Sequence, residues 1–337
     1  MGHQRARIAE AIVVLFCCGL LLTAAAEAAD DESRAQELFR KMTEATRQLN
    51  YDGVFIYQRG HHTDSMRIVH RASAGGEQER LISLSGAPRE VIRNNGTVTC
   101  IFPETHSVTI DRNHPRQLFP ALIQPMTELN KYYRFVMLGH DRVAGRATSI
   151  VGIQPRTAFR YGYRLWIDDE DNLLLRSDVV NSRGTALEQI LFTQIRQPAT
   201  IPDELLEPDI DSSNFTQHDQ GGEDETPGGA AGEAGNGRWK VQWVPEGFVL
   251  REYQVQKMAS SREPVRHIVY SDGLAMVSIF VEKLGAGDPA LKGFSAMGAV
   301  NAYSTTADHF QITAVGEVPP LTVRQIATSV IPVADAK

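Results

Sequence analysis

One segment of the sequence divides the chain into two parts that must fold separately. Residues 212–237 (SSNFTQHDQGGEDETPGGAAGEAGNG) contain no Val, Ile, Leu or Met and a single Phe, among acidic side chains and many glycines. This composition cannot bury enough apolar surface to offset the entropy lost on ordering, so we interpret the segment as a flexible acidic linker. It predicts a first domain over residues 29–211 and a second domain over residues 238–337.

The first 28 residues have the parts of a secretory signal peptide. Arg5 and Arg7 form a short basic region, residues 12–22 are apolar, and small residues then lead to Ala26 and Ala28. The apolar run is only about half the length that a membrane-spanning helix needs. We therefore predict cleavage after Ala28, or after Ala26 as the alternative, and export to the periplasm as a soluble protein.

Export removes two of the three cysteines, because Cys17 and Cys18 lie within the predicted signal peptide. The exported chain then has no internal disulfide, and its stability must come from hydrophobic cores. The remaining Cys100 alternates with Val98 and Phe102 in a strand-like run. This pattern favours a buried, small apolar side chain over a reactive thiol.

The first domain begins with a helix and continues as strands. Apolar residues recur at helical spacing from Ala35 to Leu49, and Asn50 to Gly53 end the helix. A long antiparallel meander with one helix over a face is a curved sheet, which would leave an apolar concavity beside the helix. The expected strands cover residues 54–58, 66–71, 80–84, 90–93, 98–102, 107–110, 133–138, 148–153, 159–167, 173–180 and 186–195.

The second domain is predicted to be a smaller α+β module. Ser271 to Gly273 form a hairpin turn, residues 293–298 read as a glycine-rich loop, and residues 322–329 form a closing helix. Its expected strands cover residues 249–256, 265–271, 275–282 and 310–315.

Signatures of catalysis and of cofactor binding are missing from the sequence. It has no G-x-S-x-G elbow, no serine–lysine pattern, no phosphate-binding glycine loop and no H-E-x-x-H motif. The formal net charge of −7 argues against a nucleic-acid binder. We therefore predict that the chain is not an enzyme and has no cofactor.

Two clusters resemble metal sites but are better explained otherwise. His61, His62 and His70 accompany Asp64, yet adjacent strand residues point to opposite faces and cannot readily share one metal. The acidic run at residues 168–172 lacks the central glycine and the distal glutamate of a calcium loop. We interpret the first as ordinary histidines and the second as a solvated turn, and predict no metal site.

Ten side chains are candidates for ligand contacts. Seven apolar or aromatic ones form either an ordinary core or the lining of a lipid cavity between helix and sheet, and sequence alone does not separate the two readings. Three arginines are candidates for anionic contacts, because guanidinium forks bind carboxylates and phosphates at two points. The apolar candidates are Leu38, Phe39, Met42, Phe55, Tyr57, Tyr161 and Tyr163, and the arginines are Arg156, Arg160 and Arg164.

Six short segments, in order along nearly the whole exported chain, resemble the MucB/RseB family of periplasmic regulators of the envelope-stress sigma factor. Each segment is short, and their order and spacing together carry the resemblance. The segments are Leu49–Phe55, Tyr163–Asp168, Asn172–Ser177, Trp243–Phe248, Ser271–Phe280 and Val315–Pro319.

The resemblance implies a fold of two domains and a regulatory function. The N-terminal domain would be an antiparallel half-barrel wrapped around a helix, similar to the LolA and LolB lipoprotein carriers, and the C-terminal domain a smaller α+β unit. Family members bind the periplasmic part of a membrane-spanning anti-sigma factor of the RseA/MucA type and shield it from regulated proteolysis. Lipopolysaccharide, through lipid A or related acyl chains, would bind the regulator and release that partner.

Two further expectations come from the same resemblance. The family makes a homodimer plausible, although no sequence feature specifies one. The alternative function is a periplasmic carrier of lipoproteins or lipids, because the half-barrel is common to both classes. A carrier would have no evident need for the second domain, which favours the regulator.

Overall fold

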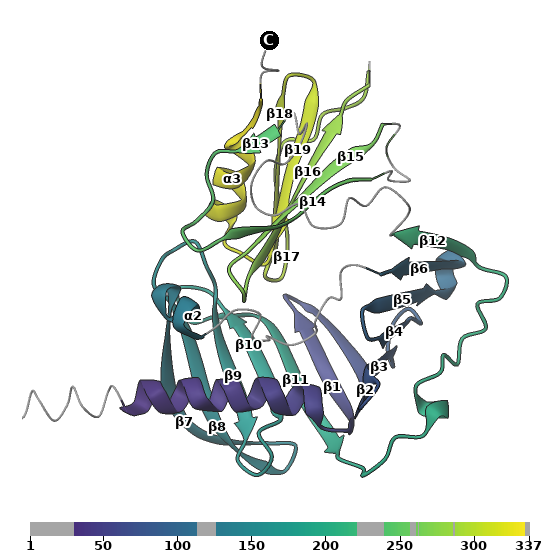
Figure 1. Cartoon of the computed structure of the whole chain (residues 1–337), viewed down its shortest axis with the longest axis vertical. Helices are drawn as coiled ribbons and strands as arrows, with labels where there is room; N and C mark the ends of the chain where they lie inside the picture. The colour runs from purple at the N-terminus through teal and green to yellow at the C-terminus, as the bar shows by residue number, and fades with distance from the viewer. Residues whose placement is uncertain are drawn as a thin grey trace, which may run out of the picture.

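The protein consists of a larger unit, in which a curved sheet surrounds a helix, and a smaller unit, whose sheet lies against one side of the larger unit (Figure 1). The predicted signal peptide and most of the predicted linker lie outside the described residues. Within the described ranges, no helix has the length and apolar character needed to cross a membrane. This computed structural model describes residues 30–112, 126–220, 239–256, 261, 263–285 and 287–333.

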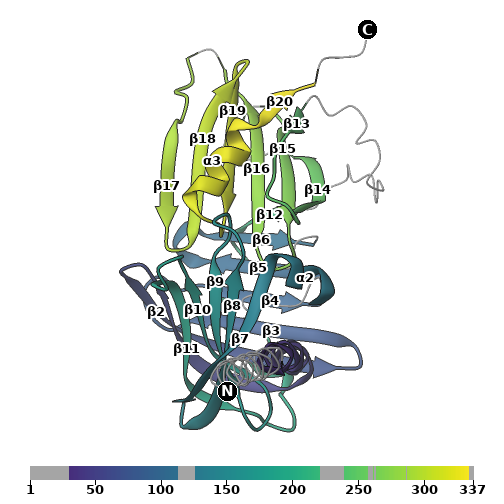
Figure 2. The same ribbon diagram turned by 90° about the vertical axis from the view of Figure 1, so that its left-hand side faces the viewer.

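The larger unit is an open sheet of twelve strands that curves around the N-terminal helix, residues 30–48. Figure 2 looks along this helix and shows the sheet wrapped around it. The strand order is β12-β6-β5-β4-β3-β2-β1-β11-β10-β9-β8-β7, and the predicted antiparallel half-barrel is confirmed. The elements are β1 (Tyr51–Arg59), β2 (His62–Ser73), β3 (Gly76–Ser83), β4 (Glu90–Asn94), β5 (Thr97–Phe102), η1 (Pro103–Thr105), β6 (Ser107–Asp111), α2 (Met126–Tyr132), β7 (Tyr133–Val143), β8 (Arg146–Pro155), β9 (Gly162–Asp168), β10 (Leu174–Val180), β11 (Ala186–Arg196), η2 (Asp203–Leu205) and β12 (Thr216–Gln220).

The helix is held against the sheet by one apolar stripe. Ala35, Phe39 and Met42 recur at helical spacing and are fully buried. The Phe39 ring lies 5.5 Å from the ring of Phe135 on β7, so the stripe packs directly on the concave face. Burying a side chain of this size stabilises the fold by about 2–3 kcal/mol.

The first strand pairs with the last strand of the antiparallel meander, which ties the two ends of that segment together. β1 lies between β2 and β11, and Phe55 is opposite Phe192 in the register. At Gly53 an added Cβ would meet the Phe192 ring at 2.7 Å. A glycine is therefore required there, because any side chain would push the ring out of the core.

A strand forms where the sequence predicts linker. β12 runs parallel to β6. It begins at Thr216, whose amide donates to the His106 carbonyl at 2.8 Å. The Phe215 ring lies 5.2 Å from the His106 ring, and Arg112 forms a 3.1 Å ion pair with Asp219. Main-chain hydrogen bonds hold an edge strand without apolar burial, so composition did not reveal it.

The strand that carries Cys100 is less buried than its alternation predicts. Val98 is buried, Cys100 is partly buried and Phe102 is 37% exposed. Figure 1 shows the reason: β5 lies beyond the end of the N-terminal helix, which covers the sheet around β1. Alternation indicates which face can be covered, and only the fold decides how far the cover extends.

The smaller unit is a six-stranded antiparallel sheet with one helix on a face, as expected of an α+β module. Its strand order is β14-β15-β16-β19-β18-β17, and a two-stranded ladder of β13 with β20 joins its beginning to its end. The buried Val323, Ile326 and Ala327 of α3 pack on the sheet, and the predicted closing helix is confirmed. The elements are β13 (Trp239–Val241), β14 (Val249–Gln256), β15 (Val265–Ser271), β16 (Met276–Lys283), β17 (Gly293–Met297), β18 (Val300–Ala307), β19 (Phe310–Gly316), α3 (Pro320–Thr328) and β20 (Val330–Pro332).

The interpretation of residues 293–298 as a glycine-rich loop is wrong. Gly293 to Met297 form β17, which pairs with β18 through a tight turn at Gly298 and Ala299. Gly293 is the first residue of the strand and Gly298 follows its last residue, and both have positive φ. Two glycines so close together suggested a loop, whereas they mark the two ends of one strand.

We predict that Phe39→Ala destabilises the larger unit by roughly 3–5 kcal/mol, because the cavity left beside Phe135 cannot collapse under a rigid helix. Urea unfolding followed by circular dichroism measures the change. Leu138→Ala is the matched control, since Leu138 is 44% exposed, and it should change stability by less than about 0.5 kcal/mol. Equal effects of the two substitutions would contradict this account of the core.

Candidate functional site at the boundary between the two units

The seven apolar candidates all lie in a single cluster between the helix and the sheet. Leu38 and Tyr57 are partly buried at its margin. The Phe55 and Phe192 rings, 5.5 Å apart, show how closely the interior is packed with the chain's own side chains. A lipid that enters here must displace some of these side chains. The buried members are Phe39, Met42, Phe55, Tyr161 and Tyr163.

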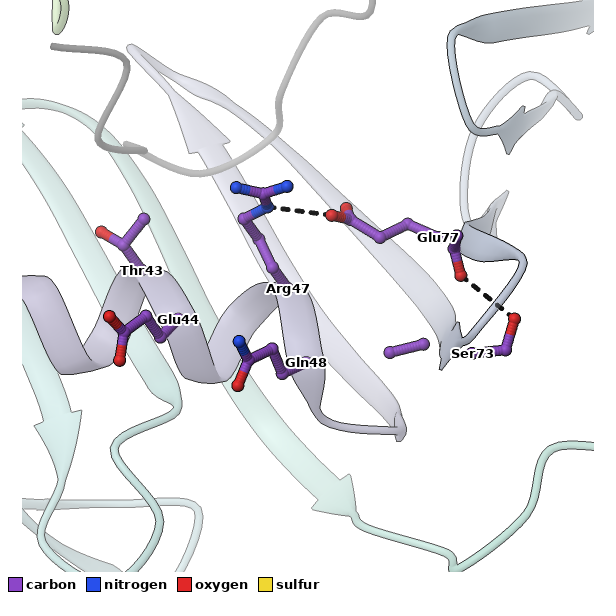
Figure 3. A pocket seen from close by; sticks show the side chains of 8 residues that line it. Thr43, Glu44, Arg47, Gln48, Ser73 and Glu77 are labelled. Atoms are coloured by element: carbon purple, nitrogen blue, oxygen red, sulfur yellow. Dashed lines mark hydrogen bonds and ion pairs between the residues drawn. The ribbon is translucent and has the colours of Figure 1, made fainter.

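A groove of about 460 Å³ lies outside this cluster, at the carboxyl end of the N-terminal helix (Figure 3). The last turns of the helix and the β2–β3 hairpin form its walls, and Arg47 Nε donates to Glu77 Oε1 across it at 2.9 Å. None of the seven apolar candidates lines it. Its charged walls suit a polar solute better than an acyl chain.

The structure separates the three arginine candidates. Arg156 is half exposed and donates from Nε to the Asn130 carbonyl at 3.1 Å. Arg164 is partly buried and donates to the Gly184 carbonyl. Arg160 is buried. It lies in the turn before β9, since that strand begins at Gly162 and not at residue 159 as predicted. The predicted start of this strand at residue 159 is therefore wrong, and Arg160 precedes the strand on which Arg164 lies.

Arg160 forms a buried ion pair with Asp272 of the smaller unit. Arg160 Nε donates to Asp272 Oδ2 at 2.5 Å, and both side chains are at most 1% exposed. The Tyr133 hydroxyl donates to the same oxygen at 2.9 Å. The guanidinium carbon lies 4.9 Å from the ring centres of both Tyr132 and Phe248. Aromatic faces thus replace water around the charged group.

A second contact is made by the turn between β17 and β18. The Ala299 amide donates to Glu188 Oε1 at 3.0 Å, and the Tyr57 hydroxyl donates to Glu188 Oε2 at 2.9 Å. At Gly298, an added Cβ would lie 2.2 Å from Arg59 Cγ and 2.5 Å from Glu188 Oε1. The turn therefore approaches β1 and β11 so closely that only glycine fits, and Gly298 also has a positive φ of 64°.

A third group of contacts is made by Asn301 of β18, Glu317 directly after β19 and Thr322 of α3. Asn301 donates to the Tyr161 hydroxyl at 2.9 Å, and Thr322 donates to the Phe159 carbonyl at 2.9 Å. Tyr163 donates to Glu317 at 3.4 Å. Burial, reinforced by the negative charge of Glu188, raises the pKa of Glu317 to about 7 against an opposing effect of the Tyr163 hydroxyl.

Sequence reasoning missed three carboxylates at the boundary, Asp272 and Glu317 of the smaller unit and Glu188 of the larger one. Asp272 was recognised only as part of a hairpin turn, and its Oδ1 does accept from the Leu274 and Ala275 amides in that role. Its other oxygen holds Arg160, which lies far away in the sequence. Glu188 and Glu317 stand in ordinary strand and turn positions. A carboxylate in a turn or at a strand surface is normally solvated, so nothing in the neighbouring sequence indicates that these residues contact the other unit.

The histidines singled out for metal binding are dispersed. His62 Nε2 lies 3.1 Å from Asp64 Oδ1 at an exposed turn. His70 is buried, stacks on Tyr51 at 4.6 Å and bonds the Leu49 carbonyl through Nδ1. Among the described residues, no three His, Cys, Asp or Glu side chains are grouped in a way that could hold a metal ion.

Family models match both units of the chain. A model described as the MucB/RseB N-terminal domain matches residues 34–210, and one described as the MucB/RseB C-terminal domain matches residues 233–331. The two matches together account for most of the sequence.

Known proteins resemble the chain over nearly its full length. It is 32% identical to the sigma factor AlgU regulatory protein MucB of Pseudomonas aeruginosa over 331 residues, which cover 96% of this chain and 98% of that protein. It is 30% identical to the sigma-E factor regulatory protein RseB of Haemophilus influenzae over 314 residues, 92% of this chain and 95% of that protein. A solved structure of the Pseudomonas aeruginosa MucA/MucB complex matches 89% of this chain and 99% of that chain, with a TM-score of 0.68 and 30% identity.

We predict that Arg160→Met uncouples the two units. The substitution leaves Asp272 buried without its cation, which costs about 3–5 kcal/mol. Urea unfolding monitored separately in the two units should change from one transition to two, because the contact between them is lost.

A double-mutant cycle with Asp272→Asn supplies the control. Asparagine retains the Oδ1 acceptor that holds the Leu274 and Ala275 amides, so the hairpin turn remains intact. The double variant should be less destabilised than the sum of the single variants. Strict additivity would mean that the pair does not couple the units.

Proposed function

The chain belongs to the MucB/RseB family, and from this premise we propose that it binds the periplasmic segment of a membrane-spanning anti-sigma factor. By covering that segment it would keep the anti-sigma factor from regulated proteolysis and so repress the envelope-stress sigma factor. The observation that carries the proposal is the likeness, over 89% of this chain, to a protein whose structure was solved as a MucA/MucB complex. Such shielding requires a binding surface and no catalytic group.

The proposed place of action is the periplasm, which the basic and apolar pattern of the first 28 residues supports. Only there would the chain meet the exposed part of an inner-membrane protein together with misdirected lipid. A homodimer remains a prediction, which sedimentation of the purified protein would test. The proposed function needs neither a metal nor a cofactor.

The proposed signal is lipid A or another acyl-chain ligand that enters the apolar cluster between helix and sheet. Support comes from the extent of that cluster and from Leu38 and Tyr57, which lie at its partly open margin. A ligand shifts a conformational equilibrium only by binding one state more tightly than the other. Because the cluster is filled by side chains in this structure, acyl chains would favour a rearranged state and so alter the partner surface.

A binding experiment tests the proposal. The exported chain is immobilised and presented with the periplasmic segment of its anti-sigma factor, first alone and then with lipid A micelles. We expect retention of the segment without lipid and release when lipid is added. Failure to retain the segment in the absence of lipid would overturn the proposed function.

A matched pair of variants tests the lipid part separately. Leu38→Asn places an amide at the margin of the apolar cluster and should weaken release by lipid by roughly tenfold, while retention of the segment is unchanged. Leu138→Asn changes an exposed leucine of β7 in the same way and should behave like the parent. If both variants respond fully to lipid, the ligand enters elsewhere.

The alternative of a lipoprotein carrier makes a different prediction. A carrier would accept lipoprotein from one membrane and deliver it to another without reference to an anti-sigma factor. Transfer of a labelled lipoprotein between vesicles, with no retention of the anti-sigma segment, would favour that reading.

A further inference from the structure

Two carboxylates lie at the boundary between the units, one on each side. Glu188 belongs to β11 of the larger unit and is 8% exposed. Glu317 follows β19 of the smaller unit and is partly buried against the Tyr163 hydroxyl. Each is held by a group from the other unit, because Glu188 accepts from the Ala299 amide and Glu317 accepts from Tyr163.

We propose that Glu188 and Glu317 make the docking of the smaller unit on the larger one dependent on proton concentration, so that acid favours the docked arrangement and alkali loosens it. This inference concerns the two units of the chain alone and does not rest on the proposed partner.

The pair is surrounded by phenols and by one arginine. Tyr57 on β1 donates to Glu188, and Tyr161 and Tyr163 approach Glu317 from the β9 side. Arg59 on β1 is opposite Glu188 in the register, and both side chains crowd Gly298. Its guanidinium carbon lies over the Tyr57 ring at 5.8 Å, so Arg59 supplies a cation on the Glu188 side of the pair, whereas the Tyr163 hydroxyl donates to Glu317. Burial raises the pKa of both Tyr57 and Tyr163, so these phenols remain neutral donors around neutral pH.

The other buried contact of the boundary has the opposite character. Arg160 and Asp272 attract each other, and Tyr133 donates to the same carboxylate oxygen. Burial raises the pKa of Tyr133 well above its usual value, so this donor too keeps its proton. The boundary therefore combines an ionic contact that holds the units together with a carboxyl group, Glu317, that opposes docking once it is ionised.

The sign of the effect follows from the pKa of Glu317. Burial and the charge of Glu188 raise it from an ordinary 4.5 to about 7 in the docked arrangement, so a separation that exposes Glu317 to water would lower its affinity for the proton. The contribution of Glu317 to docking is therefore fully present below pH 4.5 and is lost as the pH rises through about 7. A difference of this size corresponds to roughly a three-hundredfold change in the docking equilibrium.

Spin labels in the two units would measure docking directly. In a Cys100→Ser background, the exposed Gln194 of β11 and the exposed Lys292 before β17 are replaced by labelled cysteines. The urea concentration is fixed at the value at which half of the molecules show the docked distance at about pH 6. An increase or a decrease in the docked fraction is then visible. We expect the docked fraction to fall steeply between about pH 5 and about pH 8.

Three variants of the labelled chain decide the outcome. Glu317→Gln should keep the docked fraction high and independent of pH, whereas Glu207→Gln, an exposed carboxylate outside the boundary, should retain the full pH response. Gly298→Ala should lower the docked fraction at every pH, because the new Cβ collides with Arg59 and Glu188. The inference is overturned if the parent does not respond to pH, if Glu317→Gln responds like the parent, or if Gly298→Ala leaves docking unchanged.

Discussion

The buried ion pair between Arg160 and Asp272 fixes how the two units of this protein meet. An ion pair removed from water recovers its desolvation cost only when the geometry is good and the remaining hydrogen-bonding groups are satisfied. Here the Tyr133 hydroxyl donates a further hydrogen bond to the Asp272 carboxylate, and the Glu246 carbonyl accepts one from the Arg160 guanidinium. Such a pair tolerates little displacement, so it specifies one orientation of the units. The contacts at Ala299, which lie at another part of the boundary, depend on that orientation.

Much of the fold could be predicted from the sequence because its signals are local. The helical spacing from Ala35 to Leu49 and the alternation within strands each indicate a buried face, and the order of strands then implies an antiparallel meander. β12 could not be predicted, because a backbone ladder at a sheet edge leaves no apolar pattern. The role of Arg160 could not be predicted either, since its partner lies in the other unit and its strand begins two residues later than the arginine itself.

The seven apolar candidates show a different limit of sequence reasoning. Helical spacing and strand alternation indicate which side of the helix and which face of the sheet are apolar, but they carry no information on whether the space between them is a void or a packed core. The contact between Phe39 and Phe135 joins the first helix to a strand from the middle of the chain. Only the curvature of the sheet decides that these two rings meet. In a regulator of the MucB/RseB family, a filled interior also means that a ligand must compete with the protein's own side chains.

The ladder between β13 and β20 has a mechanical consequence. Trp239 is opposite Pro332, so the chain enters and leaves the smaller unit at neighbouring points. A force applied between the linker and the C-terminus would break the hydrogen bonds of this ladder one after another. It would not load them all at once, as a shearing force does. The two-stranded ladder would then open before the six-stranded sheet. Adjacent ends also suit insertion of the unit into a surface loop of another protein.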